Sequence, residues 1–385
     1  MNIYDLKTPS FVIDEGKLEK NLILLNEVEK RTGARILLAQ KCFSGFCEYP
    51  LIAKYISGTT ASGLFEAKLG FEEMASKYGS ENHVFSPAYR EEDMEEIAAI
   101  CDHIIFNSKR ELLKYKPVVE SVMKKTGKTV EVGVRINPEC STQKDHAIYD
   151  PCSPGSRMGI RLCDMDEEIM AHIDGFHFHT LCEQNSDDLE TTLKAVEDKF
   201  GPYLHRLKWL NMGGGHHITR DDYDVERLVR CINHIKETYH LEVYLEPGEA
   251  VALNAGYNIT KVLDIVENDV KILILDTSAA CHMPDVLEMP YRPPLRDSGE
   301  AGEKAYTYRL SSNTCLAGDV IGDYSFDKEI KIGDKLIFED MAIYSMVKNN
   351  TFNGIPLPDI AAMDKNGECR IIKQFGYEDF KNRLS

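Results

Sequence analysis

The sequence lacks the features that would mark a membrane, secreted or nucleic-acid-binding protein. Its 385 residues contain no apolar run near the ~20 residues that a membrane-spanning helix needs. The opening, MNIYDLKTPSF, lacks the basic-then-apolar pattern of a signal peptide, so we expect a cytoplasmic protein. Basic residues are outnumbered, 45 Lys and Arg against 63 Asp and Glu, for a net charge of −18. This balance argues against general affinity for nucleic acid or membranes and weakly favours cationic small ligands.

The eleven cysteines form no disulfide or zinc pattern. Their number is odd and no C-x-x-C pair occurs. A chain of this length buries enough surface without covalent staples, so we expect free thiols in a reducing compartment. The sequence also has no Walker loop, no G-x-G-x-x-G and no H-E-x-x-H, which are specific phosphate-binding or metal-binding patterns.

Short apolar runs alternate with amphipathic stretches over the first two thirds of the chain. This alternation is typical of βα units around a parallel sheet. Helical spacing of apolar residues occurs at 62–77, 91–100, 186–200 and 221–239. The runs between such stretches predict eight strands: 34–38, 59–62, 83–85, 103–106, 130–136, 174–179, 207–211 and 242–246. We therefore predict an α/β protein with a (β/α)8 TIM-type barrel over residues 14–258.

The remainder of the chain has a different pattern. Short alternating runs separated by turn residues, such as KVLDIVEN, KILILDT, AYTYRL and KIGDKLIFEDMAIYSM, predict a C-terminal all-β domain. Residues 8–13 also read as a strand, ahead of the first barrel helix. We expect this N-terminal strand to complete the sheet, so that residues 1–13 and 259–385 form one domain.

Chemistry in a βα barrel lies at the carboxyl ends of the strands. The first predicted strand leads to Lys41, three residues beyond its end, whose amine, if desolvated, becomes a nucleophile for a carbonyl group. The sixth carries His177 and His179 on one face. One interpretation is that these two histidines are core residues. The other is that they are metal ligands, with Cys182 or with His216 and His217 as further ligands. The spacing matches no specific metal motif, and we expect no metal.

The last two barrel strands add a glycine cluster and a carboxylate. Gly213, Gly214 and Gly215 follow the seventh strand, where backbone amides can approach an anion closely, although such a cluster also suits a tight turn. Glu246 ends the eighth strand. Together with Lys41 and His179, these residues supply an amine for an aldehyde, a flat ring, a phosphate site and an acid for a pyridine nitrogen. Pyridoxal 5′-phosphate needs those four groups.

Longer blocks of the chain carry a family resemblance. They are GTTASGLFEAKLG, YDPCSPGSRMGI, GFHFHTLCEQNSD, LNMGGGHHITRDDYDVE, YLEPGEAVALNAGY, CHMPDVLEMPYRPP and TCLAGDVIGDYSF. In these blocks the sequence resembles the barrel-type pyridoxal-phosphate decarboxylases of fold type III, the alanine racemase-like group. Within that group it is most similar to the carboxynorspermidine (carboxyspermidine) decarboxylases, and the resemblance covers nearly the whole chain.

The resemblance implies roles for individual residues. Lys41 is implied to bind the cofactor aldehyde, His179 to stack on the ring, Gly213 to Gly215 to hold the phosphate and Glu246 to pair with the pyridine nitrogen. Cys315 is implied to act in the active site of the partner subunit of an obligate head-to-tail homodimer. Tyr344 and Asn353 match positions beside the cofactor.

Two positions depart from relatives within the group. Glu249 stands where ornithine decarboxylase relatives carry a phosphate-binding Arg, so part of the phosphate must be bound by other groups. Leu316 stands where diaminopimelate decarboxylases place an acid after the active-site cysteine, which argues against diaminopimelate as substrate. Both differences agree with a carboxypolyamine substrate.

The reaction implied is decarboxylation of carboxynorspermidine or carboxyspermidine to norspermidine or spermidine, in polyamine biosynthesis. We expect Asp276 and Asp285 of the β domain to meet the substrate's distal amines. The alternatives are another basic or diamino acid decarboxylase, a racemase, a homologue without catalysis, or a metal-dependent barrel hydrolase that uses His177 and His179.

Overall fold

The computed structural model describes residues 1–143 and 150–385, so Tyr149 of the block YDPCSPGSRMGI lies outside the described residues. The chain divides into two compact units, residues 21–251 and residues 1–20 with 252–385. Among the described helices, none is both long and apolar enough to cross a membrane. The domain limits that we predict at residues 14 and 258 stay a prediction.

The first unit is a closed barrel, which confirms the predicted fold class. Among the described residues, eight parallel strands pair in chain order, and the last closes on the first. The strands are β2 (Arg35–Ala39), β3 (Gly58–Ala61), β4 (Glu81–Phe85), β5 (His103–Phe106), β6 (Glu131–Arg135), β7 (Gly175–His177), β8 (Trp209–Asn211) and β9 (Glu242–Leu245). They are buried along most of their length because side chains fill the inside and helices cover the outside.

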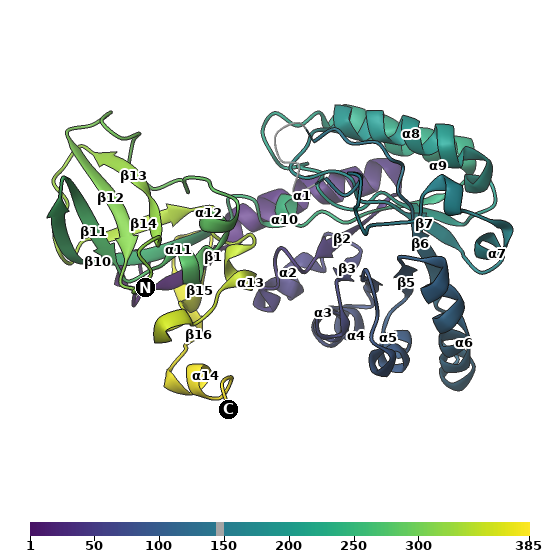
Figure 1. Ribbon diagram of the computed structural model, residues 1–385, viewed down its shortest axis with the longest axis horizontal. Coiled ribbons are helices and arrows are strands. Elements are labelled where there is room, and N and C mark those ends of the chain that lie inside the picture. Colours follow the sequence, from purple (N-terminus) through teal and green to yellow (C-terminus); the bar gives the residue numbers. More distant parts are fainter. Residues whose placement is uncertain (144–149) are drawn as a thin grey trace. The chain divides into compact units, whose positions relative to one another are not determined.

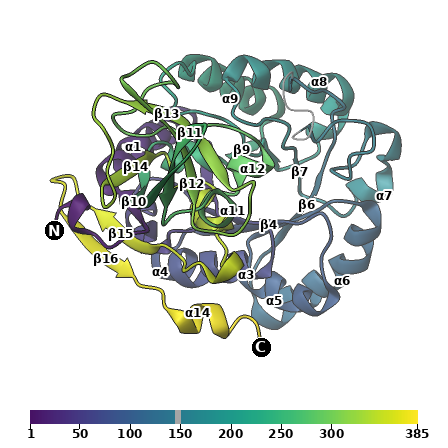
Figure 2. The same cartoon turned by 60° about the vertical axis from the view of Figure 1, so that its left-hand side comes forward.

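Helices surround these strands in an arc that Figure 2 shows from α3 to α9. Their apolar faces supply the outer layer of the core; in α9, for example, Leu228, Ile232 and Ile235 are all fully buried. The helices of the first unit are α1 (Glu15–Thr32, which begins in the other unit), α2 (Tyr49–Ile52), α3 (Leu64–Gly70), α4 (Ser76–Tyr78), α5 (Met94–Ile100), α6 (Lys109–Thr126), α7 (Glu167–Met170), α8 (Ser186–Leu204), α9 (Val225–Tyr239) and α10 (Glu249–Ala252).

Trp209, the first residue of β8, fills the barrel near the amino ends of the strands. Its ring packs with Tyr244, Leu37 and Ile105 in one buried cluster. A methyl group on the neighbouring strand glycines, Gly133 or Gly175, would collide with the Trp209 ring. Glycine on two adjacent strands is therefore what gives the indole its space.

The second unit is a mixed sheet (Figure 1). Its strands are β1 (Ser10–Asp14), β10 (Gly256–Asn268), β11 (Val270–Leu275), β12 (Tyr306–Ser312), β13 (Val320–Phe326), β14 (Lys335–Glu339), β15 (Asp359–Met363) and β16 (Cys369–Lys373). Short helices connect them: α11 (Ala279–His282), α12 (Asp285–Glu288), α13 (Ser345–Lys348) and α14 (Tyr377–Lys381).

The N-terminal strand completes this sheet, as predicted. β1 lies between β10, with which it is antiparallel, and β15, with which it is parallel. Three details differ from the prediction. β14 ends at Glu339, five residues before Tyr344 turns the chain with φ +55°, so the apolar run to residue 346 is not one strand. No predicted run covers β13, β15 or β16, and the predicted helix at 62–77 is interrupted by a π turn at Phe71–Ala75.

Candidate active site

Four of the predicted barrel residues lie just beyond the carboxyl ends of strands. Lys41 follows β2 by two residues, His179 follows β7 by two, Gly213 follows β8 by two, and Glu246 directly follows β9. Because the strands are parallel, these ends share one mouth of the barrel. The structure therefore brings Lys41, His179, the glycines and Glu246 to the same end.

Glu246 is a buried carboxylate held by three neutral donors. Its Oε1 accepts hydrogen bonds from Thr60 Oγ1 at 3.0 Å and Asn211 Nδ2 at 2.8 Å. Its Oε2 accepts one from His177 Nε2 at 3.0 Å. Glu246 is 7% exposed and all three donors are buried. The three donors therefore hold the Glu246 carboxylate in one place. A glutamate that served only solubility would not need such donors.

The charge of Glu246 is not cancelled by the histidine. Burial alone would raise the pKa of Glu246, but interactions with His177 and the hydrogen bond from Asn211 bring it well below its usual range. Burial lowers the pKa of His177, so this imidazole is neutral and donates its Nε2 proton. The barrel mouth thus presents a buried negative charge that suits a cationic partner.

His179 is fixed by the glycine loop and by Arg135. The N–H of Gly214 donates to His179 Nδ1 at 3.0 Å, and Arg135 Nη2 donates to the His179 carbonyl oxygen at 2.8 Å. Burial and the nearby charge of Lys41 hold the pKa of His179 well below its usual range. A neutral imidazole with its ring plane set in this way is suited to stack on a flat ligand.

The glycine loop is only partly available to an anion. The N–H of Gly213 donates to Asn211 Oδ1 at 2.9 Å, and that of Gly214 is bonded to His179. The N–H of Gly215 donates to no described residue. Gly213 and Gly215 have φ of +67° and +80°, and a Cβ on any of the three would collide with neighbouring backbone. Glycine is thus required by the backbone, and one amide of the three remains for a ligand.

Lys41 is an exposed side chain at this mouth. Among the described residues it makes no hydrogen bond or ion pair. Its charge lowers the pKa of His179 and also lowers that of Glu66, although burial raises the pKa of Glu66 overall. Its ammonium group is therefore available to a ligand without breaking an existing contact.

The predicted residues of the second unit form a separate group. The Cys315 N–H donates to Asn353 Oδ1 at 2.7 Å, and Cys315 is exposed. Asn353 and Tyr344 both have positive φ, 59° and 55°, which is uncommon for residues other than glycine. The loop before β13 is held by buried Asp319, which accepts hydrogen bonds from Ser312 Oγ and Thr314 Oγ1 at 2.6 Å each.

The two predicted distal acids have different surroundings. Asp276 accepts hydrogen bonds from Thr8 Oγ1, Thr260 Oγ1 and the Lys261 N–H at 2.6 to 2.8 Å, which ties three segments of the sheet together. Asp285 pairs with Lys348 Nζ at 2.5 Å, and Glu288 lies 3.5 Å from the same ammonium. Their assignment to the substrate stays a prediction.

One cluster with metal-ligand side chains occurs among the described residues. It contains Glu81, His83 and His103 and lies at the amino ends of β4 and β5, the end of the barrel opposite to the mouth. The two imidazoles are stacked with their centroids 4.0 Å apart. Parallel rings do not aim their in-plane lone pairs at one point, so this pair suits packing better than metal coordination. His177 and His179 are not part of the cluster.

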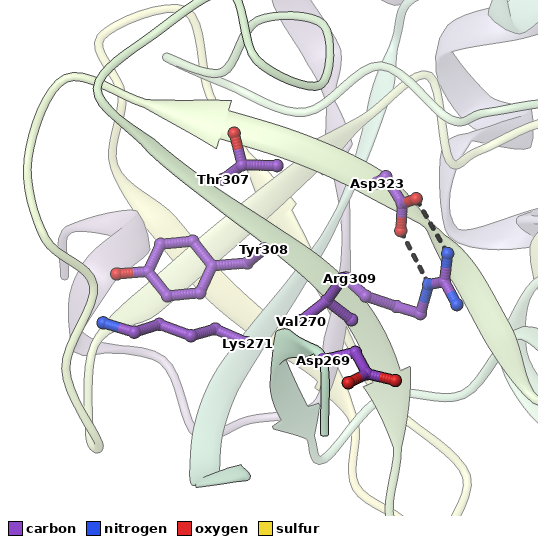
Figure 3. Close-up of a pocket in the computed structure, with 7 residues that line it drawn as sticks. All are labelled: Asp269, Val270, Lys271, Thr307, Tyr308, Arg309 and Asp323. Atoms are coloured by element: carbon purple, nitrogen blue, oxygen red, sulfur yellow. Dashed lines mark hydrogen bonds and ion pairs between the residues drawn. The ribbon is translucent and has the colours of Figure 1, made fainter. Parts of the chain in front are cut away.

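A surface hollow lies on β11, β12 and β13 of the second unit (Figure 3). Arg309 and Asp323 in its wall neutralise each other through two hydrogen bonds of 2.8 and 2.9 Å. None of the predicted site residues lines this hollow. Its position gives no reason to place the chemistry there.

Comparison with known proteins identifies the family. The family described as pyridoxal-dependent decarboxylase, C-terminal sheet domain, matches residues 3–342. The chain belongs to the pyridoxal-dependent decarboxylases. A carboxynorspermidine/carboxyspermidine decarboxylase from Campylobacter jejuni is 41% identical to this decarboxylase, over 98% of each chain. A carboxyaminopropylagmatine decarboxylase from Synechocystis is 39% identical, over 98% of this chain and 96% of that one.

Solved structures agree with this assignment. The crystal structure of a Campylobacter jejuni carboxynorspermidine decarboxylase complexed with norspermidine has a TM-score of 0.90 at 40% identity, covering 98% of this decarboxylase and 100% of that chain. A Helicobacter pylori diaminopimelate decarboxylase has a TM-score of 0.81 at 17% identity, which shows a shared fold.

The barrel mouth fits pyridoxal phosphate, the cofactor of this decarboxylase family. Glu246, ionised and buried, suits a protonated pyridine nitrogen. Lys41 offers an amine for the aldehyde, and His179 offers a neutral ring of fixed orientation. This donor set is what the cofactor requires from its protein.

Sequence reasoning did not find three residues that hold this site. His177, predicted as a core residue or a metal ligand, donates to Glu246. Thr60 and Asn211, which also donate to Glu246, are not among the predicted residues. Both occur at the carboxyl ends of barrel strands, so the rule that found Lys41 and Glu246 could have found them if applied to neutral polar residues as well.

Proposed function

We propose that this decarboxylase removes the α-carboxylate of carboxynorspermidine or carboxyspermidine and releases norspermidine or spermidine, a step of polyamine biosynthesis. The buried ionised Glu246 at a mouth shared with Lys41 carries the proposal for the cofactor chemistry. The relatives from Campylobacter jejuni and Herminiimonas arsenicoxydans, 41% and 33% identical over at least 98% of this chain, support the substrate class.

The barrel residues divide the work of binding and orientation. The Lys41 amine would hold the cofactor through its aldehyde. Glu246 keeps a proton on the pyridine nitrogen, since its three hydrogen bonds hold the carboxylate ionised and in place. His179 stacks on the ring, and Gly215 offers its N–H to the phosphate. Tyr344 and Asn353 are proposed beside the cofactor.

When bound, the cofactor supplies an acceptor for the electron pair that the departing carbon dioxide leaves at Cα. Glu246 would make that acceptor effective, because its carboxylate favours a protonated pyridine nitrogen. Either the Cys315 thiol or the Lys41 ammonium then returns a proton to Cα. Cys315 acts across a homodimer interface in this proposal, and the Asn353 side chain holds its backbone in position.

Asp285 already binds an ammonium group, that of Lys348. A distal amine of the substrate has the same chemistry and can take the place of Lys348, so we retain Asp285 as a substrate-binding residue, with Asp276 as the second candidate. We expect Asp285→Asn to raise KM more than it lowers kcat. Steady-state kinetics checks this split, and an unchanged KM removes Asp285 from the proposal.

Carboxyaminopropylagmatine is the second candidate substrate, because the relative of that activity is 39% identical. Its distal end is a guanidinium group, whereas that of carboxyspermidine is an ammonium group. A planar five-donor guanidinium and a compact ammonium require different acceptors. The two substrates can therefore be separated by direct competition.

The deciding experiment measures carbon dioxide release by the purified protein with pyridoxal phosphate. The substrates are carboxynorspermidine, carboxyspermidine, carboxyaminopropylagmatine and diaminopimelate, and Lys41→Ala is the blank. We expect release from the first two that disappears in the variant. Release only from one of the others replaces the substrate assignment. No release from any of them, with cofactor bound, refutes the proposed function.

We also propose that the protein acts in the cytoplasm. The negative net charge and the eleven cysteines, which form no disulfide among the described residues, support this location. Fractionation of cells that express the tagged protein tests it.

A further inference from the structure

His217, two residues after the glycine loop, is a buried histidine with one ring nitrogen unused. The residue is 7% exposed, and its N–H donates to the Gln184 carbonyl oxygen at 3.2 Å. Gln184 in turn donates its own N–H to the Gly215 carbonyl oxygen at 3.0 Å. The imidazole is thus held rigidly next to the loop.

The contacts of His217 decide which nitrogen carries the proton. Arg220 Nη1 lies 3.3 Å from His217 Nδ1, and a guanidinium can only donate, so Nδ1 is the acceptor. Arg220 is itself held by Asp222 Oδ1 at 2.5 Å and the Glu183 carbonyl oxygen at 3.0 Å. Burial and the charge of Arg220 lower the pKa of His217 to about 4, so the ring is neutral. The single N–H is therefore on Nε2.

This N–H has no acceptor among the described residues. Glu249 Oε2 is 3.9 Å from it, beyond hydrogen-bond distance. A buried donor without an acceptor is unfavourable, so such a group is expected to have a partner that binds from outside. The N–H of Gly215 is the second donor of this loop without a described acceptor.

We propose that His217 Nε2–H and the Gly215 N–H bind the phosphate of pyridoxal phosphate, and that Arg220 is the positioning residue that fixes the His217 tautomer. The assignment rests on the proposed cofactor chemistry of the barrel. A phosphate monoester fits beside Glu249, because its second pKa of about 6 lets it share a proton with a neighbouring carboxyl group. The chain would then hold the phosphate largely through neutral donors.

The test compares two ligands that differ only in the phosphate. Binding of pyridoxal phosphate and of pyridoxal is measured by absorbance titration of purified wild type, His217→Leu, His217→Gln and Arg220→Met. His234→Ala is the control, since His234 is an exposed residue of α9. A hydrogen bond to a charged group corresponds to about 10- to 100-fold in affinity.

We expect His217→Leu to weaken binding of pyridoxal phosphate by about 10- to 100-fold and to leave pyridoxal within about twofold. His217→Gln, whose amide can donate from the same place, should recover part of the loss, and Arg220→Met should lose less than His217→Leu. Equal weakening of both ligands, or no weakening, overturns the proposal. If His217→Leu does not fold, His217→Gln and Arg220→Met decide by the same ratio. Wild type that binds neither ligand refutes the cofactor assignment instead.

Discussion

At the scale of the residue, Glu246 shows how surroundings decide chemistry. Its carboxylate is buried with three neutral donors, and it stays ionised because those hydrogen bonds outweigh the cost of burial. A glutamate on the surface would offer a ligand a weaker, solvated charge. The position matters more than the residue type.

We expect Glu246→Gln to bind pyridoxal phosphate but to lower kcat by about 100- to 1000-fold, the usual effect of losing one electrostatic group of an active site. The amide keeps the size of the side chain and removes its charge. Decarboxylation kinetics and cofactor absorbance measure the two effects separately. Glu226→Gln, at an exposed glutamate paired with Arg31, is the control. A kcat within twofold of wild type would exclude Glu246 from catalysis.

At the scale of the element, the glycine loop depends on backbone geometry. The amino ends of the barrel strands depend on neutral histidines. Gly215 has φ +80° and lies against the Leu181 carbonyl group. Gly127, which ends α6, has a similar φ of +73° but no atom within 4 Å of a Cβ. These two glycines separate the cost of the dihedral angle from that of the collision.

Gly127→Ala should lower the free energy of unfolding by about 1 kcal/mol, because alanine tolerates positive φ poorly. Gly215→Ala should cost a further 1 to 3 kcal/mol or so, because the methyl group also displaces backbone. Urea unfolding of both variants measures the difference. Equal losses would mean that the loop moves aside at no cost.

Acid should destabilise the barrel through His83 and His103. Burial lowers the pKa of His83 to about 4 and that of His103 to about 2, so both are neutral in the folded state. The unfolded chain takes up protons below about pH 6.5, so the free energy of unfolding should fall from pH 6.5 towards pH 4, by about 1.4 kcal/mol per pH unit for each histidine.

Unfolding at several pH values measures this slope. His83→Phe should reduce the slope by about 1.4 kcal/mol per pH unit, the contribution of one of several buried histidines, and His234→Phe, at an exposed histidine of α9, is the control. A slope that is the same in wild type and His83→Phe would show that other groups cause the acid sensitivity.

At the scale of the whole molecule, the predicted catalytic residues belong to different compact units, Lys41 to the barrel and Cys315 to the sheet. We propose a homodimer in which each site takes Lys41 from one subunit and Cys315 from the other. Light scattering should then give about 87 kDa, twice the chain mass of 43.6 kDa.

Mixing two variants, each of which lacks one of the two proposed catalytic groups, tests the shared site. Lys41→Ala and Cys315→Ala, refolded together, should recover about a quarter of the wild-type activity, because half of the dimers are mixed and each holds one intact site. Each variant refolded alone is the control. No recovery, with mixed dimers present, would place Lys41 and Cys315 of one site in the same subunit.

Local pattern alone determined the fold class and the residues at the strand ends of this protein. Eight short apolar runs alternate with amphipathic stretches, and parallel strands bring their carboxyl ends together, so the sequence assigns Lys41, His179 and Glu246 to one mouth. The same reasoning placed the N-terminal strand in the sheet. These conclusions depend on neighbours in the chain and on general rules of topology.

Tertiary structure decided what surrounds those residues. Thr60 donates to Glu246 across 186 positions of the chain, and no spacing rule connects them. The Gly213 and Gly214 amides proved to be used by Asn211 and His179, which leaves Gly215 for a ligand. Hydrogen bonding and desolvation depend on which atoms meet after folding, and that information lies in packing between distant segments.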